Sequence, residues 1–394
     1  MSGTGDRMPA LITHDFFGRD VYNDLFNLIG GSKDEADAFL LGNQGPDPMF
    51  YCVLDFGLRP YSRLAHVMHG EQPTKLIYAL KKSLDVLEPQ EKAVGRAYAL
   101  GFLCHYTLDS GMHPFIYFQQ YSLCDAGEPG LTREDGSEVH AVIESELDEL
   151  VLYEKRGETV ATFNPSREIL RASNEVLRII SKMIVSMAWD TYDEEVPGTM
   201  FERSVNCHRL AMAAIYSPTG IKREILGSIE GLFRRHSFIK ALTSRPVELT
   251  ESVFDNHECR PWQNPFTGEV RSIGFWGLYE ESLARAEKNI RAFDDRAFDE
   301  QTAKSITAGL NFEGQPAEAT IVSVRDAAAV AAEAAAEAAK AAEAAAAQAA
   351  RAADAAQAAG AVADAAEDEP ADAETSAGAE VPGGDEPAGA GESA

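Results

Sequence analysis

The sequence lacks a disulfide framework. Its five cysteines are scattered along the 394 residues, and no two of them form a C-x-x-C pair. An odd number of cysteines without regular spacing is typical of proteins from a reducing compartment. Residues 1–18 contain no long apolar run after a basic start, so we predict no secretory signal. Together these absences predict a cytoplasmic protein.

Basic residues are also few, and long apolar runs are missing. Lys and Arg total 35 against 63 Asp and Glu, a formal net charge of −28. Residues 313–394 hold 17 of the acidic and three of the basic residues, so the preceding part is acidic as well. This charge disfavours nucleic acid and anionic membranes as partners. The most apolar stretch, 176–189, contains Lys182 and is shorter than the roughly 20 residues that span a bilayer, so no membrane span is predicted.

Sustained strand alternation is absent as well. Apolar residues instead recur at three- and four-residue spacing in LIYALKKSLDVL, VGRAYALGFLCHYTLD, VHAVIESELDELVLYEK and SREILRASNEVLRIISKMIVSMA. We therefore predict an all-α fold, a multi-helix bundle over residues 8–300. The aromatic residues Trp262, Phe266, Phe275 and Trp276 are expected to pack its last helices rather than to wall a pocket.

Beyond the helical domain the composition changes. Residues 301–326 are interpreted as a linker, and residues 327–366 are nearly all Ala with scattered charged residues. That Ala-rich segment has high helix propensity but no Leu, Ile or Phe stripe to bury, which predicts a solvated, partly helical spacer. Residues 367–394 are predicted to be a disordered acidic tail. The alternative is a partner-binding arm, whose partner the sequence does not identify.

One apolar stretch, GFLCHYTLDSGMHPF at 101–115, places polar residues at helical spacing. His105, Asp109 and His113 follow one another at intervals of four, so neighbours in this series share a helix face. Gly111 and Pro114 predict that the helix ends or bends near His113. Buried imidazoles and carboxylates need partners, because an unpaired ionised carboxylate is costly in an apolar setting. A metal cluster and a hydrogen-bonded His–Asp pair both satisfy this need.

A second helix repeats the His-x-x-x-acid spacing. His140 and Glu144 stand four apart in VHAVIESELDEL, just after a loop. Glu146 and Asp148 follow, and we expect them to point to other faces and to meet solvent. Such polar pairs are common on helix surfaces, but two of them in one domain strengthen the interpretation as a metal site.

The remaining candidates lie nearer the start of the chain. Asp47 is held between two prolines in GPDP, where Pro48 favours an extended conformation and a rigidly placed carboxylate. His66 and His69 in LAHVMHGE are alternatives for one inward-facing residue, and His14 lies among apolar residues. Nitrogen and oxygen ligands without thiolate suit zinc, with manganese or iron as alternatives. The full candidate set is more than one ion needs: His14, Asp47, His69, His105, Asp109, His113, His140 and Glu144.

These motifs resemble those of the zinc-dependent phospholipase C family, whose fold with three zinc ions is shared with single-strand-specific zinc nucleases. The resemblance is carried by PALITH, LGNQGPDPMFY, MHGE, GFLCHYTLDSGMHPF and HAVIE, and covers roughly residues 8–295. The later stretch NHECRPWQNPFTGE is similar to the end of the domain in short intracellular members.

The resemblance implies two complete ligand sets. One zinc would be held by Asp47, His69, His105 and Asp109, and a second by His113, His140 and Glu144. Asp47 would also be the catalytic residue beside a bridging water. In the family a third zinc uses His14, Asp109 and an N-terminal Trp, which this sequence lacks, so two zinc ions are expected and the third site is incomplete. The choice of His69 over His66 follows from the resemblance.

The function implied is hydrolysis of a phosphate ester by a zinc-activated bridging water, with the diester of a phospholipid head group or a smaller soluble analogue as substrate. A nuclease is disfavoured because the acidic surface should repel polyanions. A helical phosphohydrolase of the H…HD…D type is disfavoured too, because the only His-Asp dipeptide, His14–Asp15, has no His upstream. The alternative is a non-catalytic, metal-stabilised helical scaffold with a partner-binding acidic tail.

Overall fold

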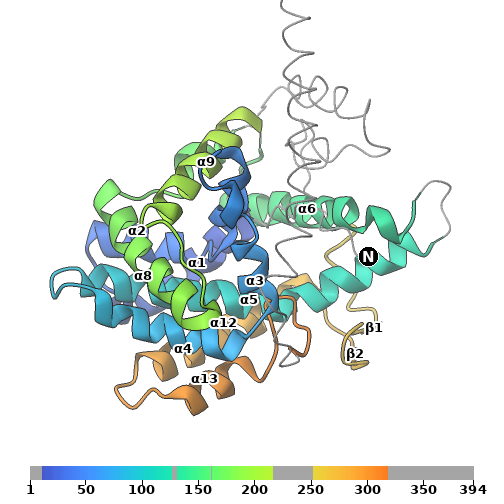
Figure 1. The fold of residues 1–394 in the computed structure, drawn as a ribbon. Coiled ribbons are helices and arrows are strands. Elements are labelled where there is room, and N and C mark those ends of the chain that lie inside the picture. The colour runs from blue at the N-terminus through green and yellow to red at the C-terminus, as the bar shows by residue number, and fades with distance from the viewer. Residues whose placement is uncertain (1–10, 127–130, 161, 216–251, 318–394) are drawn as a thin grey trace, which may run out of the picture. The chain divides into compact units, whose positions relative to one another are not determined.

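The computed structural model describes residues 11–126, 131–160, 162–215 and 252–317 (Figure 1). Their regular structure is almost entirely helical, which confirms the predicted all-α class. Short 3₁₀ segments connect the longer helices: η1 (Asp47–Leu54), η2 (Arg59–Tyr61), η3 (Ser83–Val86) and η4 (Arg133–Asp135). The α-helices are α1 (Leu11–Ile29), α2 (Lys33–Gly42), α3 (Leu64–Gly70), α4 (Pro73–Lys82), α5 (Lys92–Cys124), α6 (Gly136–Arg156), α7 (Pro165–Glu168), α8 (Asn174–Tyr192), α9 (Met200–Ile215), α12 (Phe275–Asp294) and α13 (Glu300–Thr307).

One small antiparallel hairpin interrupts the helices. Its strands β1 (Trp262–Gln263) and β2 (Val270–Arg271) pair with Trp262 opposite Arg271. Strands of two residues are too short to show the alternation by which a strand is recognised in a sequence. The Trp262 ring is buried against Phe115 of α5, with ring centroids 5.2 Å apart, so its predicted packing role is confirmed.

The 33-residue helix α5 is the centre of the fold. It packs against α1, α2, α6 and α12, and it is buried on several faces because apolar residues surround it. The predicted helix end near Gly111 and Pro114 is wrong, since α5 runs through Pro114 to Cys124. A proline inside a helix removes only the one N–H that would bond the carbonyl four residues earlier, here that of Ser110, and tertiary packing compensates for the loss.

Two glycines let α2 and α5 approach each other by their backbones. A Cβ added to Gly101 would lie 2.0 Å from the Phe39 carbonyl oxygen, and one added to Gly42 would lie 2.3 Å from the Tyr98 carbonyl oxygen. Only residues without side chains fit such a contact. The close approach brings the segment after α2, which carries Asp47, against the middle of α5.

The packed body continues into the range that the sequence interpretation assigned to a linker. Helix α13 lies partly in that range, and Phe312 is fully buried. An isolated antiparallel bridge joins Leu310 to Pro316. The predicted Ala-rich spacer at 327–366 and the acidic tail at 367–394 lie outside the described residues.

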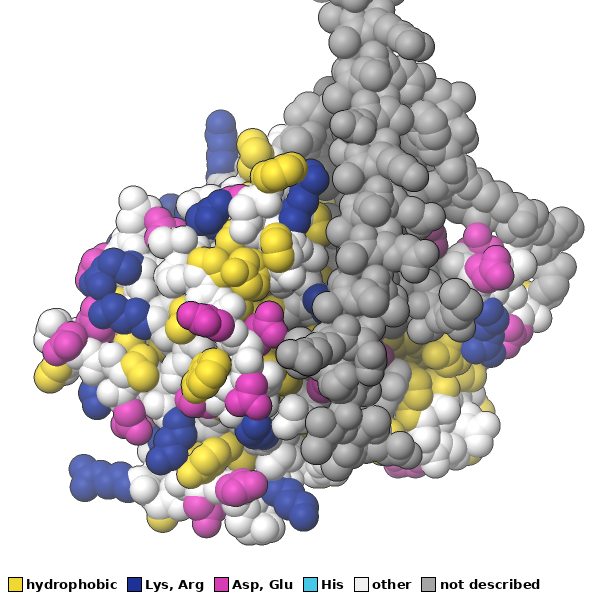
Figure 2. Space-filling view, in the orientation of Figure 1, with side chains coloured by type: hydrophobic (Ala, Val, Ile, Leu, Met, Phe, Trp, Pro, Cys, Tyr) yellow, Lys and Arg dark blue, Asp and Glu magenta, His cyan; other side chains and the backbone are white. Residues whose placement is uncertain are grey.

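Charged side chains of both signs are interspersed over the face shown in Figure 2, without a continuous basic stripe among the coloured residues. On this face the pattern differs from the basic stripe that is typical of proteins that bind a nucleic-acid backbone. None of the described helices combines the length and apolarity that crossing a bilayer demands.

Candidate metal centre

Four elements bring five side chains together beside the middle of α5. We call this group the Asp109 cluster. Its members come from the first turn of α1, the start of η1, the end of α3 and the buried part of α5, and all except His69 are at least 96% buried. They are His14, Asp47, His69, His105 and Asp109.

The Asp109 carboxylate is shared among the imidazoles of this cluster. Its Oδ1 lies 3.0 Å from His14 Nε2, and its Oδ2 lies 3.2 Å from His105 Nε2. Asp47 Oδ1 lies 3.0 Å from His69 Nε2 and 3.8 Å from His105 Nε2. Ligands at about 2.0–2.1 Å from a tetrahedral zinc are roughly 3.4 Å from one another. The spacing of these atoms is compatible with a coordination shell, and the shorter distances are also those of His–carboxylate ion pairs.

A second group, the Glu144 cluster, combines His113 of α5 with His140 and Glu144 of α6. Glu144 Oε1 lies 3.2 Å from His140 Nε2 and 3.4 Å from His113 Nε2. Because α5 continues past Pro114, His113 is fixed one turn beyond Asp109 and faces α6. The eight candidate residues thus lie in two neighbouring groups, with His14 in the first, whereas the resemblance implied a separate third site for His14.

A small cavity of about 20 Å³ lies between the two clusters, lined among others by His14, Asp109, His113, Glu144 and Phe275. That space is enough for one water-sized species and too small for an organic substrate. Phe275, expected to pack helices, therefore also borders the candidate site. The exposed parts of the site are the edges of His69 and His113, whose side chains are 11% and 14% exposed.

The donor set leaves buried atoms without partners, which tests whether a metal fits. Among the described residues, both carboxylate oxygens of Asp47, Nε2 of His105 and Oε2 of Glu144 are buried and have no partner in hydrogen-bond geometry, although Asp109 Oδ2 lies 3.2 Å from His105 Nε2. Asp47 Oδ1 is near His69 Nε2 but not in hydrogen-bond geometry. Buried polar atoms in native proteins are nearly always satisfied, and an uncompensated buried carboxylate is costly. Zinc ions would satisfy these atoms, so the residues fit the metal.

The imidazoles are also oriented as metal ligands usually are. Nδ1 of His69 donates to the Ala65 carbonyl oxygen at 2.7 Å, and Nδ1 of His113 donates to the Phe312 carbonyl oxygen at 2.8 Å. Nδ1 of His140 lies 2.9 Å from Oε1 of Gln120 and donates to it. With a proton held on Nδ1, each ring in its neutral form would present the Nε2 lone pair to its cluster.

Electrostatics keep the carboxylates of Asp109 and Glu144 ionised. Burial raises the pKa of Glu144, but the charges and hydrogen bonds of His140 and His113 outweigh it and lower the pKa to about 2. Burial also opposes ionisation of Asp109, yet the surrounding imidazoles hold its pKa well below the usual range. In turn, burial lowers the pKa of His113, and the nearby Asp109 and Glu144 charges overcome this and raise it to about 9. In each cluster, the carboxylate charges therefore favour protonated imidazoles, and the imidazoles in turn favour ionised carboxylates.

We expect zinc binding at neutral pH to release protons. Zinc binds neutral imidazole, whereas His113, with a pKa of about 9, is protonated in the metal-free chain at pH 7. Zinc affinity should therefore rise about tenfold per pH unit between pH 7 and 9 for this one proton and then level off. Calorimetric titration of the metal-free chain with zinc at pH 7, in two buffers of different ionisation enthalpy, measures the released protons.

The same shift has an opposite effect on the metal-free fold. A raised histidine pKa stabilises that fold fully below pH 6.5, and the stabilisation is lost as pH rises through about 9. Metal-free stability should thus fall over the range in which zinc affinity rises.

For the zinc titration, the matched control is the His257→Ala variant, which removes an exposed imidazole outside both clusters. It should release as many protons on zinc binding as the unaltered chain. Identical binding heats in the two buffers would contradict the assignment.

Asp148 was expected to meet solvent, and that prediction is wrong. Its side chain is 91% buried and accepts hydrogen bonds from the Ile12 N–H at 2.9 Å and from the Thr13 N–H at 2.7 Å. It thereby caps the first turn of α1 and fixes the helix that presents His14. Burial raises its pKa to about 6 despite these hydrogen bonds. The sequence spacing indicates that Asp148 shares a helix face with His140 and Glu144, because the three residues stand four apart.

Phe312 is a second residue that sequence reasoning missed. Its N–H donates to the His69 carbonyl oxygen at 3.0 Å, and its own carbonyl accepts from His113. Its ring centroid lies 5.0 Å from that of His69 and 5.7 Å from that of His105. One buried residue from the end of the described chain thus contacts both clusters, and no local pattern in the sequence indicates this.

The structure also separates the alternatives left open near Asp47. His69 lies at the Asp109 cluster, whereas His66 packs its ring on Phe50, with centroids 4.7 Å apart, and belongs to none of the candidate metal groups among the described residues. The expected extended conformation of Asp47 is wrong, because Asp47 begins η1 with Pro48 in its first turn. Proline is tolerated there, since the first N–H groups of a helix have no helical partner.

Residues 13–203 match the family model described as zinc dependent phospholipase C. The matched range contains all eight candidate ligands and, apart from the first two residues of α1, the elements that carry them. This part of the chain belongs to the zinc dependent phospholipase C family. Family membership and the two clusters together support a metal-dependent hydrolase. No curated protein and no solved structure shows a significant match to the chain.

Proposed function

We propose that the chain is a zinc-dependent phosphoric ester hydrolase that cleaves phosphodiesters, either a phospholipid head-group ester or a smaller soluble analogue. The observation that supports this most is the pair of clusters on either side of one small cavity, with four buried ligand atoms that have no partner in hydrogen-bond geometry among the described residues. Two metals a few ångströms apart are the usual arrangement for displacement at phosphorus. The cytoplasmic location stays a prediction from the sequence.

In this proposal each cluster holds one zinc ion. Asp47, His69, His105 and Asp109 would hold the first, and His113, His140 and Glu144 the second. His14, 3.0 Å from Asp109, is the remaining donor and would complete a third site only with further ligands. Bound zinc supplies Lewis acidity toward the phosphoryl oxygens and lowers the pKa of water that it binds.

The chain's own groups orient and protect the reacting centre. Asp47 is fully buried between two imidazoles, and its free oxygens suit it to accept or hold a proton of the attacking water. The three Nδ1 hydrogen bonds fix the imidazole rings, and the Phe312 ring excludes water on the side of His69 and His105. Substrate must approach past the partly exposed edges of His69 and His113.

The metal content of the purified chain tests this proposal. We expect about two equivalents of zinc by elemental mass spectrometry in protein prepared without added ions. His105→Ala and Glu144→Ala should each lose about one equivalent, because each removes a donor from a different cluster. The control, His257→Ala, should keep both. Hydrolysis of bis(4-nitrophenyl) phosphate, assayed in parallel, should fall in the first two variants alone.

The outcomes also separate the enzyme from the scaffold. Two firmly bound zinc ions without turnover of any phosphodiester would favour the non-catalytic scaffold, since closed structural zinc sites keep no position open for substrate. Little zinc, unchanged by either substitution, would refute a metal centre and leave the residues as buried hydrogen-bonded pairs.

A further inference from the structure

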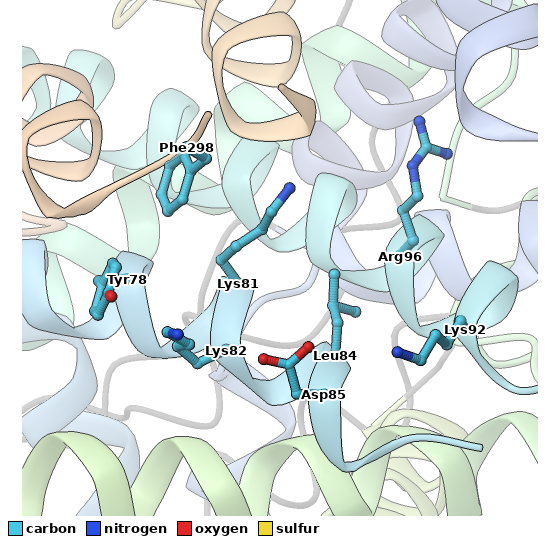
Figure 3. A pocket seen from close by; sticks show the side chains of 8 residues that line it. All are labelled: Tyr78, Lys81, Lys82, Leu84, Asp85, Lys92, Arg96 and Phe298. Carbon is cyan, nitrogen blue, oxygen red and sulfur yellow. The ribbon is translucent and has the colours of Figure 1, made fainter. Parts of the chain in front are cut away.

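A second, larger pocket lies away from the metal centre. Its volume is about 350 Å³, and α4, η3, the start of α5 and the segment after α12 line it (Figure 3). Lys92 and Arg96 precede His105 on α5 by 13 and 9 residues, which is about 20 and 14 Å along the helix. The lining residues are Tyr78, Lys81, Lys82, Leu84, Asp85, Lys92, Arg96 and Phe298.

The charge of this pocket opposes that of the chain. Four of the eight lining residues are basic and only Asp85 is acidic, in a protein whose formal net charge is −28. Several other lysines and arginines of the described residues pair with carboxylates, as Lys155 does with Asp20 at 2.7 Å. Asp294 pairs with Arg96, and the charges of Asp294 and Asp295 act on Lys81, so the cations left to attract an anion to this concave site are Lys82 and Lys92.

Two of the four cations serve the fold. The Arg96 guanidinium donates to both carboxylate oxygens of Asp294 at 2.6 Å and to the Leu28 carbonyl oxygen at 2.9 Å. The Lys81 ammonium donates to the Phe293 carbonyl oxygen at 2.6 Å. These bonds anchor α12 to α4 and α5 and give the pocket a fixed wall.

The other two cations, Lys82 and Lys92, do not anchor any of the described helices by hydrogen bonds. Lys82 and Lys92 are exposed and make no hydrogen bond or ion pair with the described residues, apart from the contact of Lys82 with the Tyr78 ring at 5.7 Å. In Figure 3 they lie on either side of the Asp85 carboxylate. Ammonium groups free of carboxylate partners retain all their donors for a ligand.

The pocket also has an aromatic end. Tyr78 and Phe298 stack with centroids 6.4 Å apart and an interplanar angle of 17°, at the end opposite Lys92 and Arg96 (Figure 3). A ring bound there would gain apolar contact, while a phosphate nearer the lysines would gain charge-assisted hydrogen bonds. Asp85 lies between Lys82, which is at the aromatic end, and Lys92, and it is placed to accept hydrogen bonds from hydroxyl groups (Figure 3). A volume of this size is within the usual range for small-molecule sites.

We propose that this pocket binds a small organic phosphate with a planar ring, of the nucleoside monophosphate type, at a site separate from the metal centre. The ring lies by Tyr78 and Phe298, and the phosphate is held by Lys82 and Lys92. This binding is independent of the proposed hydrolysis, and the pocket contains none of the candidate metal ligands.

Calorimetric titration of the zinc-loaded full chain with adenosine 5′-monophosphate tests the proposal, with adenosine and inorganic phosphate as partial probes. We expect saturable binding of the nucleotide and at least tenfold weaker binding of either part. The double variant Lys82→Gln/Lys92→Gln should weaken nucleotide binding at least tenfold, and Phe298→Ala several-fold. The control, Lys288→Gln, removes one exposed charge on α12 outside the pocket and should change affinity less than twofold.

The titration also identifies where the nucleotide binds. Asp109→Asn should leave nucleotide affinity within twofold, because Asp109 is remote from this pocket, and affinity should fall as salt is added. No saturable binding to the unaltered chain would overturn the proposal. Equal weakening by Lys288→Gln and by the double variant, or loss of binding in Asp109→Asn alone, would overturn it as well. The last result would place the phosphate at the metal centre.

Discussion

Replacing Asp109 with asparagine is expected to lower kcat/KM for phosphodiester hydrolysis by at least about 10³-fold and to release zinc. The Asp109 carboxylate lies within 3.2 Å of two imidazoles, those of His14 and His105, and within 3.9 Å of a third, that of His69. Asparagine keeps the shape and removes the charge. Its amide also brings N–H donors into a shell that needs acceptors, which opposes metal binding. Activity and zinc content are measured on the same purified sample.

The matched control is Asp55→Asn, the same chemical change just after η1. Asp55 pairs with Arg203 in a partly exposed ion pair and contacts neither cluster, so activity and zinc should stay within twofold. The folded fraction, followed by circular dichroism, separates loss of metal from loss of structure. Asp109→Asn with unchanged zinc and unchanged turnover would remove this residue from the site.

The helices could be predicted from the sequence because their signal is local. Apolar spacing identified α5, α6 and α8. The limits changed where α5 continued through Pro114, and the predicted helical stretch 166–188 is divided into α7 and α8 by a non-helical break at 169–173. The β1–β2 hairpin was not predictable in the same way, because two-residue strands carry no periodicity.

The candidate ligands could also be read from spacing, since the four-residue steps of His105–Asp109 and His140–Glu144 place partners on one helix face. Sequence spacing does not show whether a side chain on that face is buried or exposed to solvent. Asp148 stands on the same face as Glu144, yet only the packing of α1 against α6 shows that it is buried. Phe312 reaches the clusters from more than 190 residues beyond α5's metal-facing turns, a contact set entirely by the tertiary fold.

Replacing Gly45 with alanine is expected to have the second large effect, through His105 rather than through any ligand atom. Gly45 has φ +50°, and a Cβ there would lie 2.1 Å from Cδ2 and 2.6 Å from Nε2 of His105. The His105 ring is fully buried and has no room to retreat. Zinc bound at the Asp109 cluster should be lost, with hydrolysis lowered by about 10³-fold and stability by roughly 2–4 kcal/mol.

The control variant Gly157→Ala introduces the backbone strain of a positive φ without a steric clash. Comparing it with Gly45→Ala therefore separates the effect of the clash with His105 from the effect of the strain. Gly157 ends α6 with φ +62°, and a Cβ there would meet nothing within 4 Å. This control should lose only the roughly 1 kcal/mol that a left-handed conformation costs alanine, and should keep zinc and activity. Chemical denaturation and zinc analysis of both variants give the comparison. If Gly45→Ala matched Gly157→Ala in both measurements, the turn that joins α2 to η1 would not be what places His105 opposite Asp47.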